Sequence, residues 1–194
     1  GAIRPCGENT DQLPKDIVIL WIKAMDTEFH ARFKAQARRY RYVVYNSPVR
    51  PALLHKQVTH IYAALDITKM MQAAKKFEGT HNFESFRAAA CQSKQPVRTV
   101  SHCRLIQHGA YLVLDIQADG FLHHMVRNIM GCLLEIGQGM YEIDHIDTIF
   151  AAEDRKAAGV TAPADGLYFI HADYPERFEL PQPALGPLWL NMPK

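Results

Sequence analysis

The chain has 194 residues, of which 48% are hydrophobic and 22% charged, and its formal net charge is +2. This composition is typical of a globular protein with a sizeable core and excludes a disordered or fibrous chain. No apolar run reaches the roughly 18 residues that a membrane span needs, and no leader peptide is recognisable, so we expect a cytoplasmic protein.

Cysteine and histidine spacing argues against a metal centre. The four cysteines are far apart and form no CxxC pair, and the ten histidines form no HExxH motif. Buried, reduced thiols are the simpler interpretation. We therefore expect neither a metal site nor a disulfide framework.

Positive charge is concentrated in two parts of the chain. Residues 29–65 contain no Asp or Glu, and over 29–45 basic side chains alternate with aromatic ones. Residues 85–114 also lack acids. Because the whole chain is only +2, this focused charge predicts a polyanionic partner such as RNA. The basic residues of the first part are Arg32, Lys34, Arg38, Arg39, Arg41, Arg50 and Lys56.

The first predicted elements are strands. Residues 16–22 form an apolar run that we expect to enter the core as a strand. Residues 38–45 alternate, so that Tyr40 lies on one face and its two flanking arginines on the other. A proline-containing turn follows, and residues 58–65 resemble a short strand.

Helices and a hairpin follow. Asp66 has the character of an N-cap, before apolar residues at helical spacing that end near Gly79. The strand pairs are joined by short turns and the helices fall between them, which predicts an α+β fold with a mostly antiparallel sheet and helices on one face. The later elements are a hairpin over 97–107 and 110–118, helices over 121–136 and 143–152, a strand over 166–170 and a proline-rich extended tail.

Tyr40 is the first candidate for contact with a nucleic acid base. An aromatic ring between two arginines can stack on an unpaired base while the cations neutralise nearby phosphates. A tyrosine buried in the sheet, with the arginines reaching outward, explains the same pattern.

Five motifs, in this order, resemble the TruA family of bacterial tRNA pseudouridine synthases. Together they span most of the chain, and the ordered set is far more specific than any single motif. They are FHARF (29–33), RRYRY (38–42), FESFR (83–87), GFLHHMVRN (120–128) and Gly166-Leu167-Tyr168.

The resemblance implies a cofactor-free isomerase with a pseudouridine synthase-like fold. The enzyme would convert uridine to pseudouridine in the tRNA anticodon stem–loop, at tRNA positions 38 to 40, and would act as a homodimer. In this family the bond from uracil N1 to the sugar breaks, the base turns, and it is rejoined through C5, with an aspartate as nucleophile.

The same resemblance assigns roles to individual residues. Tyr40 would pack on the target uracil, Leu167 would form an apolar wall of the pocket, and Arg127 would pair with the catalytic aspartate. Without the family, Arg127 would be interpreted as a helix-flank arginine in a surface salt bridge. The residues expected to contact tRNA are Phe29, His30, Ala31, Arg32, Phe33, Arg38, Arg39, Ala90, Cys91, Gln92, Ser93 and Lys94.

The family motif that carries the nucleophile, Arg-Thr-Asp-x-Gly-Val-His, does not occur in this sequence. Asp119 precedes the fourth motif, at a position where the family often has Asn, and is not interpreted as the nucleophile. We therefore expect a C-terminal, larger domain that is inactive alone. The expected parts are residues 1–15 as a remnant of an interdomain region, 16–174 as the synthase domain and 175–194 as the tail. A non-catalytic RNA-binding module is the alternative.

Overall fold

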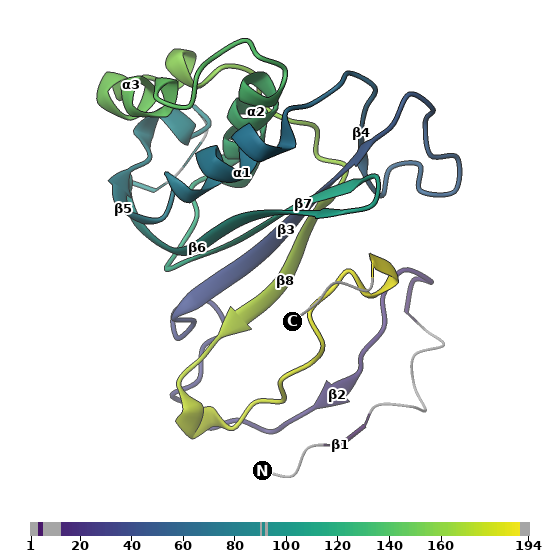
Figure 1. Ribbon diagram of the computed structural model, residues 1–194. Coiled ribbons are helices and arrows are strands. Elements are labelled where there is room, and N and C mark those ends of the chain that lie inside the picture. The colour runs from purple at the N-terminus through teal and green to yellow at the C-terminus, as the bar shows by residue number, and fades with distance from the viewer. Residues whose placement is uncertain (1–3, 6–12, 90, 92, 191–194) are drawn as a thin grey trace. The chain divides into compact units, whose positions relative to one another are not determined.

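The computed structural model describes residues 4–5, 13–89, 91 and 93–190 (Figure 1). The chain divides into two compact units. One consists of residues 1–35 and 174–181, and the other of residues 36–173 and 182–194. The larger unit contains the sheet, the helices and the core, and it confirms the predicted α+β class.

The larger unit is built on a six-stranded sheet. The strand order is β4-β3-β7-β6-β5, and β8 also pairs with β3. All pairings are antiparallel except that of β3 with β4. The strands are β3 (Ala37–Asn46), β4 (Thr59–Ile61), β5 (Gly79–Asn82), β6 (Val97–His108), β7 (Tyr111–Ala118) and β8 (Leu167–Asp173).

Three helices cover one face of this sheet (Figure 1). The first, α1, packs against α2 and β6. Apolar side chains of the helices and of this sheet face form the main core, which includes Tyr42, Phe77, Leu114 and Ile129. The helices are α1 (Ile67–Lys75), α2 (Met125–Gly137) and α3 (His145–Ala152), and the single 3₁₀ turns of this unit are Glu84–Phe86, Arg155–Ala158 and Leu188–Leu190.

Several predicted elements are confirmed within one to three residues. Asp66 caps α1, and its carboxylate accepts a hydrogen bond from the Lys69 amide at 2.9 Å. The hairpin of β6 and β7 turns at Gly109, whose φ of +59° lies in the left-handed region that glycine adopts without a Cβ penalty. Strand β8 runs three residues past its predicted end, because its pairing with β3 continues to Asp173.

Part of the C-terminal segment covers the opposite face of the sheet. The sequence predicted which strand residues lie on this face but not what covers them. Leu190 is buried against Val43 and Val113 in a second, small core. The Trp189 ring lies 5.9 Å from the ring of Tyr111. Both faces of the central strands are therefore buried.

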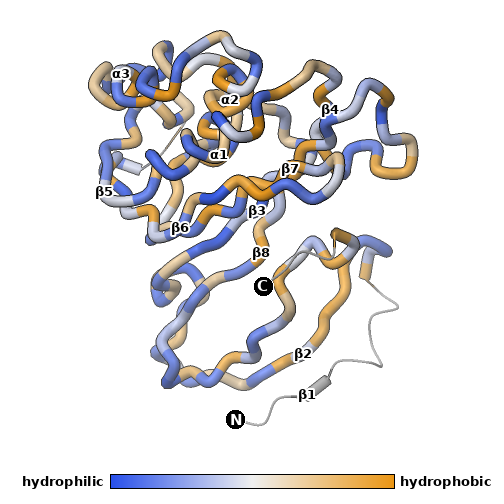
Figure 2. The backbone as a smooth tube through the Cα atoms, viewed as in Figure 1, coloured by the Kyte–Doolittle hydropathy of each residue, from blue (hydrophilic) through white to orange (hydrophobic). Residues whose placement is uncertain are grey.

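The smaller unit contains a strand that was predicted too long. Of residues 16–22 only β2 (Trp21–Ile22) is a strand, and it pairs with β1 (Arg4–Pro5). Figure 2 shows the hydrophobic run at β2, and Val18 and Leu20 are each 66% exposed. The run does not enter a core because no further strand among the described residues pairs with it. The 3₁₀ turn Glu176–Phe178 also belongs to this unit.

Candidate uridine pocket and basic surface

Three residues assigned to the site from the sequence, Tyr40, Arg127 and Leu167, line one pocket. They come from β3, the first turn of α2 and the first residue of β8. The pocket has a volume of about 300 Å³. Its full lining is Tyr40, Phe121, Leu122, His123, His124, Met125, Val126, Arg127 and Leu167.

Strand pairing places Tyr40 and Leu167 on the same sheet face. In the register of β3 with β8, Tyr40 is opposite Phe169 and Tyr42 is opposite Leu167. Gly166 allows this approach, because a Cβ there would lie 2.4 Å from the carbonyl oxygen of Val43. Its φ of +92° also disfavours any other residue.

The Tyr40 ring is held by aromatic neighbours and stays half-buried. Its centroid lies 5.0 Å from that of Phe121, edge to face, and 5.2 Å from that of Phe169. Burial raises the pKa of the Tyr40 phenol, and the positive charge of Arg38 offsets part of that rise. The hydroxyl is therefore protonated at neutral pH and can donate a hydrogen bond.

The pocket rim is formed by residues 121–124, which were predicted as the first turn of a helix. Helix α2 instead begins at Met125, and its N-cap, His124, has a left-handed φ of +62°. Burial, the adjacent His123 and the cations Arg127 and Arg155 lower the pKa of His124. Both histidines line the pocket, as Tyr40 does.

Arg127 is oriented by the backbone that passes α2. Its Nε donates to the carbonyl oxygen of Ala162 at 2.8 Å, and the Ala162 amide donates to the Arg127 carbonyl at 3.1 Å. Gly131 permits this close approach, since a Cβ there would lie 1.8 Å from the carbonyl oxygen of Val160. Among the described residues, no carboxylate lies within 4.0 Å of the Arg127 guanidinium, and the pocket lining contains no Asp or Glu.

The FHARF segment belongs to the smaller unit and forms a tight turn. The His30 imidazole nitrogen Nδ1 accepts hydrogen bonds from the amides of Arg32 and Phe33 at 3.1 and 3.2 Å. The Ala31 carbonyl accepts from the Tyr174 hydroxyl, and the Phe29 ring packs on Tyr174 within the same unit. Phe33 is 73% exposed, and the Arg32 guanidinium lies 5.7 Å from its ring centroid.

Arg38 and Arg39 lie on opposite sheet faces, as predicted from the alternation. Arg38 donates to the carbonyl oxygen of Asp119 at 2.8 Å. Arg39 instead forms two hydrogen bonds, of 2.6 and 2.9 Å, with the buried Asp115. Two of the Arg39 nitrogens are therefore engaged inside the molecule.

The 90–94 loop is tied to the pocket rim where it is described. Ala90 and Gln92 lie outside the described residues. The Cys91 sulfur accepts a hydrogen bond from the His123 amide at 3.4 Å. Ser93 bonds to Arg87 and Arg98, whereas Lys94 is exposed.

Residues 73–175 match the family described as "tRNA pseudouridine synthase". A protein of Acinetobacter baumannii (strain AYE) named "tRNA pseudouridine synthase A" is 79% identical over all of this chain, which covers 74% of that relative. The chain belongs to the tRNA pseudouridine synthase family. Proteins of the same name from Acinetobacter baylyi and Colwellia psychrerythraea are 78% and 50% identical over 99% and 95% of this chain, which covers 72% and 71% of them.

Pseudouridine synthases are isomerases.

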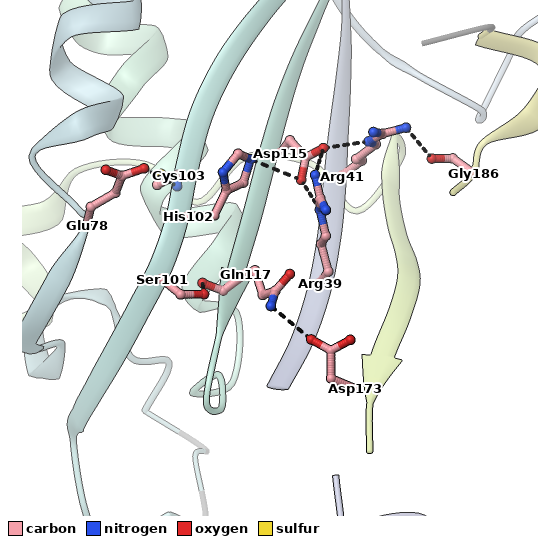
Figure 3. Close-up of polar contacts among 10 residues, drawn as sticks. All are labelled: Arg39, Arg41, Glu78, Ser101, His102, Cys103, Asp115, Gln117, Asp173 and Gly186. Atoms are coloured by element: carbon pink, nitrogen blue, oxygen red, sulfur yellow. Dashed lines mark hydrogen bonds and ion pairs between the residues drawn. The ribbon is translucent and has the colours of Figure 1, made fainter. Parts of the chain in front are cut away.

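The sheet carries a buried network of ion pairs that was not predicted from the sequence. Asp115 is 1% exposed and accepts hydrogen bonds from both Arg39 and Arg41 (Figure 3). Arg41 is 2% exposed, and its Nη1 also donates to the Gly186 carbonyl at 2.9 Å. Burial alone would raise the pKa of the Asp115 carboxyl, but its bonds to the two arginines lower it overall. The alternation of each strand was readable from the sequence, but the pairing of β3 with β7, which places Asp115 opposite Arg41, was not predicted.

His102 belongs to the same network and should make the free energy of unfolding depend on pH. Its Nε2 is buried without a hydrogen-bond partner and lies 3.6 Å from Asp115. Burial, reinforced by Arg39 and Arg104, lowers the His102 pKa against the opposing effect of Asp115. Between about pH 6.5 and the lowered His102 pKa, the unfolded chain therefore binds more protons than the folded chain does.

We expect the free energy of unfolding to fall from about pH 7 down to the lowered His102 pKa, by less than about 1.4 kcal/mol per pH unit. Urea unfolding at several pH values measures this slope. His102→Gln should make it shallower, and an unchanged slope in that variant would exclude His102 as its source.

No helix of the described part of the chain is long and apolar enough to cross a membrane. The described His, Cys, Asp and Glu side chains also form no group of three that could hold a metal ion. Cys103 and Cys132 are buried free thiols, and burial raises the pKa of the Cys132 thiol to about 12.

Proposed function

We propose that this chain provides the uridine-binding part of an isomerase that converts uridine to pseudouridine in the anticodon stem–loop of tRNA. The observation that carries the proposal is the convergence of Tyr40, Arg127 and Leu167 on one pocket of about 300 Å³. A target base turned out of its stack would pack on Tyr40 and against Leu167. The reaction would take place in the cytoplasm.

Arg127 would bind the nucleophilic carboxylate. Its Nε is held by Ala162, so the terminal nitrogens remain for a partner in the pocket. A planar guanidinium suits a carboxylate because it can donate two parallel hydrogen bonds. Among the described residues no carboxylate lines the pocket, so we propose that the nucleophile comes from a segment outside these residues and that the chain alone does not isomerise uridine.

The basic residues around the two acid-free segments would contact the tRNA. Arg32 and Phe33 are exposed on the FHARF turn, and Lys94 is exposed near the pocket rim. Arg39 would contribute mainly through its charge, since two of its nitrogens hold Asp115. We further propose that the complete enzyme is a homodimer that grips tRNA across both subunits.

Substitutions at Tyr40 test the uridine pocket by RNA binding alone. Tyr40→Ala should weaken binding of an anticodon stem–loop RNA by about 1 to 3 kcal/mol, because it removes a base–aromatic stack. Tyr40→Phe is the matched control and should retain most of the affinity. A titration by fluorescence anisotropy measures both, and equal affinity of all three proteins would show that Tyr40 is structural.

A non-catalytic RNA-binding module is the second candidate, favoured because the part of the chain that the structure describes places no carboxylate in the pocket lining. Both functions predict binding that weakens steeply with salt, because neutralised phosphates release counterions. The two functions differ when the nucleophilic carboxylate is supplied by an added segment, because only the isomerase then forms pseudouridine.

A further inference from the structure

A second pocket, separate in its lining from the uridine pocket, has no role in the function proposed above. It has a volume of about 260 Å³, somewhat below the roughly 300–1,000 Å³ of sites for drug-sized ligands, so it suits a smaller group. It lies where the loop between β3 and β4 meets the segment before β8. The lining is Arg50, Pro51, Leu54, His55, Lys56, Val58, Thr59, His60, Pro163 and Asp165.

The charge of this pocket favours an anion. Arg50 and Lys56 are two permanent cations, the imidazoles of His55 and His60 add polar nitrogens, and Asp165 is the single carboxylate in the lining. Among the described residues no carboxylate lies within 4.0 Å of Arg50 or Lys56, so neither charge is neutralised by an ion pair. Both side chains are exposed and accessible to a ligand.

Lys56 has a strained backbone conformation in the loop that lines this pocket. Lys56 has a φ of +62°, which is unfavourable for a residue with a Cβ and usually occupied by Gly or Asn. A turn from the Gln57 amide to the Leu54 carbonyl and a hydrogen bond from the Tyr168 hydroxyl to the Gln57 carbonyl hold the loop in place. Such strain persists where surrounding contacts impose it, and it clusters at ligand sites.

The two pockets share a wall. Residues 162–167 run between them: Ala162 holds Arg127, Pro163 and Asp165 line the second pocket, and Leu167 lines the first. The Tyr42 hydroxyl, on the core side of this segment, holds it in place. It donates a hydrogen bond to the Pro163 carbonyl at 2.7 Å and lies 2.6 Å from the Thr59 hydroxyl. A ligand in the second pocket would therefore lie next to the nucleotide bound in the first.

We propose that this second pocket binds a backbone phosphate of the RNA adjacent to the target uridine, with Arg50 and Lys56 as the phosphate-binding side chains. The proposal rests on the function proposed above. A phosphate needs cationic donors, which Arg and Lys supply. The Asp165 carboxylate is compatible with RNA because it can accept a hydrogen bond from a ribose 2′-hydroxyl.

The test is the salt dependence of stem–loop binding by the 194-residue chain and two double variants. Arg50→Ala with Lys56→Gly removes the two charges, and glycine keeps the left-handed backbone without strain. The matched control, Lys75→Ala with Lys156→Ala, removes two exposed charges that lie outside both acid-free segments and do not line either pocket. Thermal unfolding verifies that both variants are folded.

We expect the pocket variant to bind the anticodon stem–loop about tenfold more weakly. The slope of log K against log salt should become shallower by about 0.7 to 0.9 for each phosphate that the variant no longer neutralises. The control should keep the parent slope. Equal slopes for pocket variant and control would overturn the proposal and leave the uridine pocket intact. If the parent does not bind the stem–loop at low salt, the proposed function fails as well.

Inorganic phosphate distinguishes an RNA phosphate from the free ion. If the pocket serves the RNA backbone, phosphate at constant ionic strength should compete only weakly, since it lacks the rest of the RNA. Tight phosphate binding that the pocket variant abolishes, with an unchanged RNA slope, would assign the pocket to a free anion and overturn the proposal.

Discussion

Asp115→Ala is expected to lower the free energy of unfolding by about 3–5 kcal/mol, the typical cost of removing one partner from a buried ion pair. The substitution would leave Arg41, 2% exposed, buried without its carboxylate, and would also release Arg39. Urea denaturation monitored by circular dichroism measures the change. Asp147→Ala is the matched control, because its ion pair with Lys76 is exposed and should matter little.

The network also gives a rescue experiment. Replacing Asp115 by Leu together with Arg41 by Met removes the two most buried charges of the network and leaves only the partly exposed Arg39 without its carboxylate. Removing both members of a buried ion pair is often close to neutral for stability. The double variant should therefore be more stable than Asp115→Ala. If Asp115→Ala itself costs less than about 1 kcal/mol, the ion pairs of Asp115 with Arg39 and Arg41 do not stabilise the fold as expected.

Arg127 is expected to produce the largest effect on catalysis. The test requires the chain to be joined to the part of the 79% identical Acinetobacter baumannii relative that this chain does not cover, since it covers 74% of that relative. In that protein Arg127→Leu should lower kcat about 10²- to 10³-fold, in the range found when a preorganised electrostatic group is removed from an active site.

Two readouts separate this role from a structural one. Arg127→Leu also removes the hydrogen bond to Ala162, so unfolding must be measured beside turnover. Arg127→Lys should restore part of kcat by returning the charge, and stem–loop affinity should change little in either variant. A decrease of affinity or stability in proportion to kcat would make Arg127 a scaffold residue.

The sequence predicted correctly the elements that show a regular spacing of apolar residues or a clear cap or turn residue. Strand β3 followed from alternation, α1 from its cap and helical spacing, and the β6–β7 hairpin from Gly109. Each of these signals lies within the element itself. The α+β class followed from their order.

Elements that depend on distant partners were missed or misplaced. Strand β5 was not predicted, since its four residues are strand only by pairing with β6. Helix α2 starts four residues late because His124 adopts a left-handed conformation, and those four residues are pocket lining. This local departure from helical pattern coincides with the candidate site, as expected where function competes with regular structure.

The candidate site was predictable only in part. Tyr40 could be nominated from its flanking arginines, whereas Arg127 and Leu167 came from the family motifs, and their convergence needed the fold. The roles of Arg50 and Lys56 required the loop conformation at Lys56, which no sequence pattern indicates.

Pseudouridine formation in an anticodon stem–loop tests the central claim, that this chain supplies the uridine pocket and its arginine while the carboxylate comes from another segment. The assay compares the 194-residue chain alone with the same chain joined to the uncovered part of the Acinetobacter baumannii relative, at equal concentration and saturating RNA. We predict RNA binding by both and turnover only by the joined protein. Turnover by the chain alone, or binding without turnover by a folded joined protein, would contradict the account.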